Sequence, residues 1–334
     1  MKNLLKIISI VFITTVLACS KDNDSLPPVI PKVETVYVGG IADDANGFRS
    51  PTIWTNGVAQ SLPIVAGNNG WVNAVFVEGN DVYAIGYEAT NFGYKAIMWK
   101  NNIKTTLSQS TQSEAKSIFV SDGKYYVVGT VAGVATLWYN NTEVAIDTFG
   151  TKATSIHIKN NKIYIVGNEV FNTTSTKAVL WKNEVSLTYP IAFTKTLIEN
   201  NANVRDVFYD GTNLHSVGSA YLTLNTAKLW KNNLPSEQYG DDSLMFSVFV
   251  NEQNVYAAGI TNRPNKATLW KNNAQTVLSQ NNSTAEAVFA TSSNVYVVGY
   301  ETATTEKACI WRNGEIKILS DNFSRAYSVF VTEK

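Results

Sequence analysis

The heptapeptide ATLWKNN, residues 267–273, decides the fold because the chain repeats it. Close copies end at Asn102, Glu184 and Asn233, and looser copies read TIWTNG, TLWYNN and CIWRNG. Each copy carries one tryptophan, and neighbouring copies lie 39 to 49 residues apart. These tryptophans are Trp54, Trp99, Trp138, Trp181, Trp230, Trp270 and Trp311. A short motif at nearly regular spacing indicates a protein built from repeated structural units.

Two other motifs accompany each tryptophan. A strand-like run that ends in glycine precedes it, as in YYVVG ending at Gly129 and VYVVG ending at Gly299. An earlier run has the form SVFV or AVFV, and a short apolar run follows the tryptophan. Each unit therefore predicts four short strands joined by polar turns. The Asn-Gly pairs at 56–57 and 313–314 favour tight hairpins, because both residue types tolerate positive φ.

Four antiparallel strands in one unit cannot bury both of their faces, but copies stacked around an axis can. We therefore predict an all-β fold, a seven-bladed β-propeller of four-stranded antiparallel blades. The repeated tryptophans are expected to pack between blades, since burying an indole removes roughly 200 Å² from water.

The two ends of the repeat region complement each other. The first unit begins at VYVGG and lacks its first strand, whereas a spare copy of that strand, AYSVFVTEK, ends the chain. We therefore predict that the C-terminal strand completes the first blade and closes the ring. Closure removes the open sheet edge that a linear array would expose.

The order of these motifs resembles that of kelch-like propellers, in which a glycine-ended second strand follows the innermost strand. The resemblance covers residues 33–334, the predicted propeller domain. It departs from the kelch pattern because six of the seven units have one glycine in place of two. The resemblance implies the fold and does not imply the function of kelch proteins.

The N-terminus has the layout of an export signal, with Lys2 and Lys6 ahead of an apolar run. The sequence VLAC, ending at Cys19, resembles the lipobox of bacterial lipoproteins. That resemblance implies a signal peptide over residues 1–18, lipid attachment at Cys19 and a membrane partner through the lipid anchor. The following stretch, 19–32, contains prolines and is predicted to be a flexible tether.

The residues after the cysteine bear on the membrane. Ser20 and Lys21 stand where lipoproteins retained in the inner membrane have an aspartate directly after the cysteine. We therefore predict an outer-membrane anchor, with the folded body on the periplasmic or the extracellular face. The alternatives are an ordinary signal peptide that contains a cysteine, and a short core helix.

Composition argues against several function classes. The chain has 27 Lys and Arg residues and 27 Asp and Glu residues, so it has no excess of positive charge. We therefore expect no nucleic-acid partner. The two histidines, His157 and His215, occupy repeat positions that are aromatic in other units, and Cys309 is the one cysteine besides Cys19. These residues lack metal-ligand spacing, and no nucleophile or phosphate-loop signature occurs. We expect no cofactor, no metal and no catalytic residue.

The connections between the second and third strands, and those between blades, vary most in length. Strand alternation places both sets on one face of the propeller, which we call the loop-rich face, and binding residues concentrate on such loops. Trp71 is expected in one of these loops. The candidate ligand-binding residues expected there are Asp43, Asp44, Phe48, Arg49, Trp71, Tyr87, Glu88, Phe92, Tyr94, Tyr239, Asp241, Asp242, Tyr300 and Glu301. Exposed aromatic and arginine side chains suit protein anchors or sugar stacking, although a single loop aromatic can also cap a blade.

Together these features predict an outer-membrane or cell-surface lipoprotein that is not an enzyme and binds a protein or a polysaccharide through its loop-rich face. Two alternatives remain. One is a scaffold for envelope assembly, and the other is a hydrolase or lyase acting on glycans. The glycan-acting alternative needs carboxylates, for which Asp43 and Glu88 are the predicted candidates.

Overall fold

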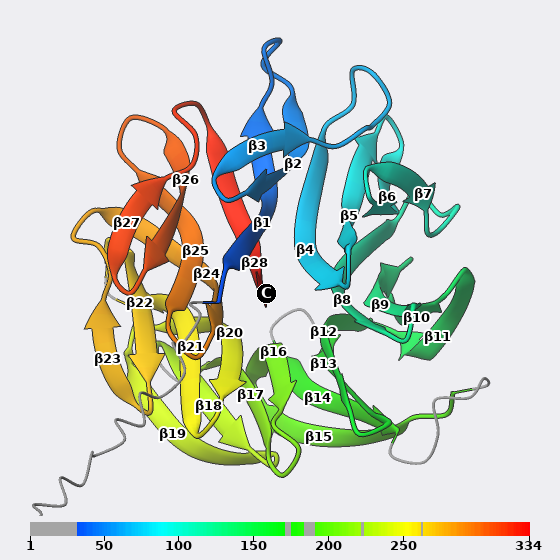
Figure 1. The fold of residues 1–334 in the computed structure, drawn as a ribbon. Helices are drawn as coiled ribbons and strands as arrows, with labels where there is room; N and C mark the ends of the chain where they lie inside the picture. The colour runs from blue at the N-terminus through cyan, green and yellow to red at the C-terminus, as the bar shows by residue number, and fades with distance from the viewer. Residues whose placement is uncertain (1–31, 171–174, 184–190, 222–223, 262) are drawn as a thin grey trace, which may run out of the picture. The chain divides into compact units, whose positions relative to one another are not determined.

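The computed structural model describes residues 32–170, 175–183, 191–221, 224–261 and 263–334 (Figure 1). The predicted signal peptide, Cys19 and all of the predicted tether except Lys32 lie outside these residues. From Glu34 onward, strands form seven four-stranded antiparallel sheets arranged in a ring. The predicted fold, an all-β seven-bladed propeller, is confirmed. The part of the chain described here has no helix that could cross a bilayer.

The innermost strands of the blades line the central axis, and neighbouring ones contact each other around it. They are β28 (Ser324–Glu333), β4 (Gly70–Glu78), β8 (Ser113–Ser121), β12 (Thr151–Lys159), β16 (Ala202–Tyr209), β20 (Leu244–Asn251) and β24 (Asn282–Ala290). The second strands are β1 (Glu34–Asp43), β5 (Asp81–Thr90), β9 (Lys124–Val131), β13 (Lys162–Val170), β17 (Leu214–Tyr221), β21 (Asn254–Thr261) and β25 (Val295–Thr302). We number the blades in this order, so blade 1 contains β28 and β1, and blade 7 contains β24 and β25.

The outer half of each blade is a second hairpin. The third strands are β2 (Arg49–Thr55), β6 (Gly93–Lys100), β10 (Val134–Tyr139), β14 (Thr176–Asn183), β18 (Asn225–Lys231), β22 (Lys266–Lys271) and β26 (Glu306–Arg312). The fourth strands are β3 (Val58–Ser61), β7 (Ile103–Thr106), β11 (Thr142–Phe149), β15 (Thr194–Asn200), β19 (Leu234–Asp241), β23 (Ala274–Val277) and β27 (Glu315–Ile318).

The C-terminal strand closes the ring. Strand β28 pairs antiparallel with β1, from Glu34 opposite Glu333 to Ala42 opposite Ser324. The two strands lie side by side in Figure 1, in red and blue. The prediction that the C-terminus completes the first blade is therefore confirmed.

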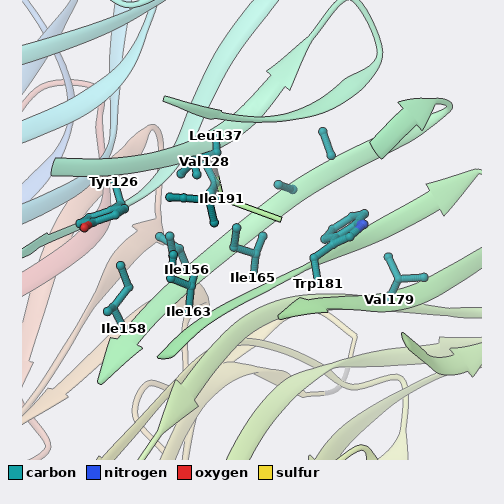
Figure 2. Packing of buried hydrophobic residues seen from close by; sticks show 12 residues of the cluster. Tyr126, Val128, Leu137, Ile156, Ile158, Ile163, Ile165, Val179, Trp181 and Ile191 are labelled. Atoms are coloured by element: carbon teal, nitrogen blue, oxygen red, sulfur yellow. The ribbon is translucent and has the colours of Figure 1, made fainter. Parts of the chain in front are cut away.

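The repeated tryptophan packs against the preceding blade. In blade 4, Trp181 belongs to an apolar cluster with Tyr126, Val128 and Leu137 of blade 3 (Figure 2). Equivalent clusters place each of the other six indoles against the blade before it. All seven tryptophans are at most 1% exposed, so each blade shields one indole of the next from water.

The asparagines that follow the tryptophan make the turn to the fourth strand. Asn272 and Asn273 have φ of 46° and 71°, which a tight hairpin requires. The Asn272 side chain accepts the backbone N–H of Val255 at 2.8 Å, and Asn101 and Asn232 act in the same way on blades 2 and 5. The WKNN motif thus encodes inter-blade packing, a turn and a contact to the second strand.

Every blade has a β-bulge at the same place in its innermost strand. The repeated glycine lies opposite. A Cβ on Gly129 would lie 1.9 Å from the carbonyl oxygen of Glu114, so only glycine admits this close approach. We call the extra residues the bulge ring. They are Tyr327, Asn73, Lys116, Thr154, Arg205, Phe246 and Glu286.

Candidate functional site

Seven aromatic side chains form a circle around the central axis, which we call the aromatic floor. One residue of each innermost strand contributes to it: Phe76, Phe119, His157, Phe208, Phe249, Phe289 and Phe330. Neighbouring ring centroids lie 4.3 to 5.4 Å apart around the whole circle. Burial lowers the pKa of His157 to about 4, with Lys159 acting in the same direction. His157 is therefore a neutral member of this aromatic floor at neutral pH.

The bulge ring lies between the aromatic floor and the loop-rich face, because each innermost strand starts at that face and runs inward. There a cavity of about 750 Å³ opens over blades 2 to 5. We call it the loop-face cavity. Its inner wall includes Lys116, Thr154 and Arg205 of the bulge ring, and its outer wall includes Phe92 and Tyr94. Such a volume is in the range of small-molecule binding sites.

Positive charge dominates the inner part of this cavity. Glu114 and Lys116 form an ion pair and neutralise each other. Lys152 and Arg205 are exposed and have no ion-pair partner among the residues described. The Arg205 guanidinium lies 5.8 Å from the centre of the Phe246 ring. Two cations in one concave site that form no ion pair with another described residue attract an anionic group.

Glu286 supplies a carboxyl group to the same ring of bulges. It is half-buried, and within the described part of the chain it has no hydrogen bond or ion pair. Burial raises the pKa of Glu286 to about 7, although the charges of Arg205 and Arg325 oppose this shift. At neutral pH a substantial fraction of this carboxyl group therefore carries a proton.

Two tyrosines and an arginine interact electrostatically with Glu286. Burial raises the pKa of Tyr327 to about 12, and the charge of Glu286 adds to the shift. Burial also raises the pKa of Tyr300, to which Glu286 again contributes. The Arg325 guanidinium lies 4.8 Å from the Tyr300 ring centre and donates from Nη2 to Glu306 at 2.8 Å. Both phenols stay protonated at neutral pH and can donate hydrogen bonds beside this carboxyl group.

Four of the predicted binding residues come together next to the cavity. The Trp71 and Tyr87 rings stack at 4.7 Å and 16°, and Tyr94 meets Tyr87 edge-on at 5.1 Å. Phe92 lies nearby on the cavity wall and is 85% exposed. The expectation that Trp71 lies in a loop is wrong. It is the second residue of β4 and pairs with Tyr87, because the inner hairpin continues past the bulge to the loop-rich face.

Glu88 holds parts of blade 2 together. Its side chain is buried and accepts hydrogen bonds from Lys104 Nζ at 2.7 Å, Asn68 Nδ2 at 2.7 Å and the Val65 N–H at 2.8 Å. Burial acts to raise the pKa of Glu88, but these hydrogen bonds outweigh it and lower the pKa. A buried carboxylate with three donors is a structural brace.

The predicted residues of blade 1 stay on a separate turn at the rim. Asp43 ends β1, opposite Arg49 at the start of β2. The Asp44 carboxylate accepts the backbone N–H of Phe48 at 2.9 Å, and Phe48 is 42% exposed. The Arg49 guanidinium lies 4.4 Å from the centre of the Phe323 ring. This turn is bound to itself and to the connection that leads into β28.

The remaining predicted residues are scattered over blades 5 to 7. Tyr239 donates to an asparagine of blade 6 at 2.6 Å, and Asp242 pairs with Arg263 at 2.9 Å. Glu301 accepts a side-chain amide at 3.3 Å. The side chain of Asp241 lies outside the described residues. These groups do not form one site with the loop-face cavity.

None of the seven bulge-ring residues was among the predicted binding residues. A signal for the bulge ring exists in the sequence. The residue directly before each repeated SVFV-like run is different in all seven units: asparagine, lysine, threonine, arginine, phenylalanine, glutamate and tyrosine. A single variable position within a regular repeat indicates that its side chains serve something other than packing.

The histidine and cysteine side chains lie away from this cavity. His215 is buried near the opposite end of blade 5, with Nε2 3.1 Å from Asp210. Burial lowers the pKa of His215, while Asp210 opposes the shift. Cys309 is buried, and burial raises the pKa of its thiol. No group of three His, Cys, Asp or Glu side chains able to hold a metal occurs in the described ranges.

Comparison with known proteins gives the fold and no family. No family model and no curated protein match the chain. Among solved structures, a Mycobacterium tuberculosis puromycin-hydrolyzing peptidase matches with a TM-score of 0.57 and 8% identity over 85% of this chain. The chain spans 51% of that peptidase.

A second similar structure is the β-propeller domain of the Trilobed protease from Pyrococcus furiosus. It matches with a TM-score of 0.51 and 13% identity over 86% of this chain and 95% of that domain. That domain has an open velcro topology, whereas β28 and β1 close the ring here. A Trypanosoma rangeli sialidase also matches, with a TM-score of 0.48 and 9% identity, over 88% of this chain and 56% of its own.

These comparisons contradict the prediction that the protein is not an enzyme. The similar propellers belong to a peptidase and a protease. That prediction depended on the absence of catalytic motifs from the sequence, and such an absence does not exclude an enzyme. At 8% and 13% identity the likeness establishes the fold alone, so the reaction has to be argued from this chain's own residues.

Proposed function

We propose that the protein is a hydrolase that cleaves glycans on its loop-rich face, with Glu286 as the acid. Glu286 lies on the bulge ring in blade 7, outside the residues that line the loop-face cavity, so the substrate would extend from the cavity across the bulge ring. The observation that carries this proposal is the position of the carboxyl group. Glu286 stands on a bulge at the mouth of the channel, without a partner among the described residues, while Arg205 lies close enough to act on it electrostatically. A carboxyl group with a pKa near 7 suits proton donation at neutral pH.

The residues of the channel favour glycosidic bonds over peptide bonds. Serine and cysteine nucleophiles of hydrolases usually need an adjacent histidine base. The sequence has two histidines; His157 belongs to the aromatic floor, and His215 binds Asp210 near the opposite end of blade 5. Glycoside hydrolysis uses a pair of carboxyl groups and no histidine. Glu286 can serve as the acid of such a pair.

In the proposed step, the Glu286 carboxyl group donates its proton to the glycosidic oxygen, and the bond from that oxygen to the anomeric carbon breaks. The oxygen of one water molecule bonds to the anomeric carbon, and the proton that this water loses restores the carboxyl group. Tyr300 and Tyr327 are both protonated at neutral pH, and each interacts electrostatically with Glu286. Each turnover consumes one water and creates one reducing end.

The test is turnover of polysaccharides by the signal-free protein, followed through newly formed reducing ends and mass spectrometry of the products. Glu286→Gln keeps the shape of the side chain and removes the acid, so we expect turnover to fall by about 10²- to 10⁴-fold. Glu315→Gln, on the exposed outer strand of blade 7, is the matched control and should retain activity. Equal turnover by the two variants would remove Glu286 from the mechanism.

We also propose that this body is exported, lipidated at Cys19 and anchored in the outer membrane by a tether over residues 19–32. The lipobox-like VLAC and the residues after it support this proposal. The motif order supports a kelch-like relationship of the propeller. A Cys19→Ala variant of the full chain should be lost from the membrane fraction; its retention there would contradict the anchor.

A further inference from the structure

We infer that the loop-face cavity binds an acidic polysaccharide, with Lys152 and Arg205 receiving the carboxylates of its uronate residues. This inference rests on the proposed glycan hydrolase and names its class of substrate. The two cations come from neighbouring innermost strands, β12 and β16. They line one cavity together with Phe92 and Tyr94.

The charges of the cavity favour a ligand with spaced negative groups. Lys116 is paired with Glu114, whereas Lys152 and Arg205 form no ion pair with a carboxylate in the described part of the molecule. Arg205 acts on Glu286 electrostatically without forming an ion pair with it. Arginine recognises carboxylates through parallel hydrogen bonds and lysine through its point charge. A polymer of sugar acids offers such groups at regular intervals, and a neutral glycan offers none.

The scaffold holds the two cations at a fixed separation. Asn168, opposite Lys152 in the blade 4 hairpin, bridges to blade 5. Its Nδ2 donates to the Val204 carbonyl oxygen at 3.1 Å, and its Oδ1 accepts the Val204 N–H at 2.9 Å. Val204 directly precedes Arg205. This two-way contact fixes β13 against β16, and β12 is paired with β13, so the backbone that carries the two cations needs little reorganisation on binding.

The outer wall of the cavity suits the apolar face of a sugar ring. Tyr94 is 53% exposed and is held by the stack of Trp71 and Tyr87 behind it. Phe92 stands beside it with most of its ring in solvent. Rigid aromatic rings supply contact area at a low cost in conformational entropy. Cations on the inner wall and aromatics on the outer wall match the two sides of a uronate chain.

The experiment measures binding of the signal-free Glu286→Gln protein, which preserves the polymer during the assay. The probes are polygalacturonate, alginate and hyaluronan, each beside its carboxyl-reduced form, which keeps the backbone and removes the charge. We expect at least one acidic polymer to bind about tenfold or more tightly than its reduced form. That preference should shrink as sodium chloride is raised.

Variants assign the preference to the two cations. Lys152→Gln and Arg205→Gln, each in the Glu286→Gln background, should weaken binding of that polymer by about tenfold without changing binding of its reduced form. Lys124→Gln, an exposed lysine at the start of β9, is the matched control and should bind normally. Unchanged thermal unfolding shows that each variant is folded.

The inference is overturned if none of the three polymers binds better than its reduced form, or if the two cavity variants bind as the control does. Neither result contradicts glycan hydrolysis itself. The protein could still form reducing ends from neutral glycans, and the Glu286→Gln variant would still test whether that activity depends on Glu286. The opposite outcome is also possible: acidic polymers bind through Lys152 and Arg205, but the wild-type protein does not cleave them. That outcome would support the inference and contradict the proposed hydrolase.

Discussion

At the scale of single residues, Glu286 shows how position in the repeat changes the chemistry of a side chain. Equivalent positions carry Lys116 and Arg205, and all of them are placed on the channel by the same bulge. A packing position would favour one size and polarity in every blade, as the tryptophan position does. The bulge position is freed from that constraint, so a carboxyl group can remain there at some cost in stability.

That cost can be measured through pH. The pKa of Glu286 is raised from its ordinary value of 4.5 to about 7. The folded chain therefore keeps this proton when the unfolded chain has lost it, so the stabilisation is complete below about pH 4.5 and is lost as the pH rises through 7. We expect Glu286→Gln to gain stability relative to wild type between pH 4.5 and pH 8, by roughly 3 kcal/mol at most.

Urea denaturation of both proteins at several pH values within this window gives the difference directly. Subtracting the variant from wild type cancels the other carboxyl groups, which the two proteins share. Glu315→Gln serves as the control and should follow wild type at every pH. A stability difference between wild type and Glu286→Gln that does not change with pH would mean that this carboxyl group titrates normally.

At the scale of the strand, the bulge and the glycine opposite it form one unit. The innermost strand gains one unpaired residue, and its pairing with the second strand shifts by one position there. The backbones can approach closely at this point because the second strand has a residue without a side chain. In blade 3, Gly129 faces the carbonyl oxygen of Glu114 in this way. The same close approach occurs at the repeated glycine of every other blade. The glycine therefore maintains the position of the bulge residue on the channel.

Gly129→Ala should damage both the blade and the site. The new Cβ would lie 1.9 Å from a backbone oxygen, so the hairpin must open, and we expect a loss of about 3 kcal/mol or more. Gly240→Ala is the matched control, since a Cβ there meets nothing within 4 Å and should change stability by about 0.5 kcal/mol or less. Chemical denaturation compares the two, and equal effects would contradict the role given to the bulge.

At the scale of the whole molecule, the fold could be predicted from the sequence because each of the seven repeats packs its tryptophan against the preceding blade in the same way. Trp270 and its equivalents mark the third strand, Asn272 marks the turn, and the spare strand after Ser324 predicts closure. The site could be predicted only in part. Trp71, Tyr87, Phe92 and Tyr94 stood out as aromatic residues beyond the packing pattern.

Other parts of the site escaped prediction for a physical reason. Glu286 and Arg205 are 81 positions apart in the sequence, and only the ring brings their blades near each other. A bulge shifts the alternation of buried residues by a single position, as in β4 and β8, and this shift does not say which side chain the bulge carries. Glu88 gave the opposite error: it resembled an exposed acid in the sequence, but Lys104, Asn68 and Val65 enclose it.

Ring closure joins the two ends of the propeller by more than one contact. Besides the pairing of β28 with β1, Glu34 at the start of β1 reaches into blade 7. Its carboxylate accepts Thr291 Oγ1 at 2.6 Å and Asn294 Nδ2 at 2.7 Å, and it also binds Tyr296. Blade 1 is thus attached to blade 7 through β1, and β28 also contacts β24 and β25 of that blade. One apolar cluster lies at each of the seven interfaces between blades.

Deleting Arg325–Lys334 should therefore abolish cooperative unfolding, because blade 1 loses its innermost strand and exposes a sheet edge that promotes aggregation. Calorimetry and size-exclusion chromatography would follow the loss. The control is a circular permutant that starts at Gly67, ends at Ala66 and joins residue 334 to residue 33 by a short linker, which is feasible because Glu34 and Glu333 are paired. It retains every strand and should unfold in one transition near the wild-type midpoint. A truncated protein that unfolds like wild type would show that the ring does not depend on β28. The position of Tyr327 in the bulge ring beside the blade of Glu286 would then lose its structural basis.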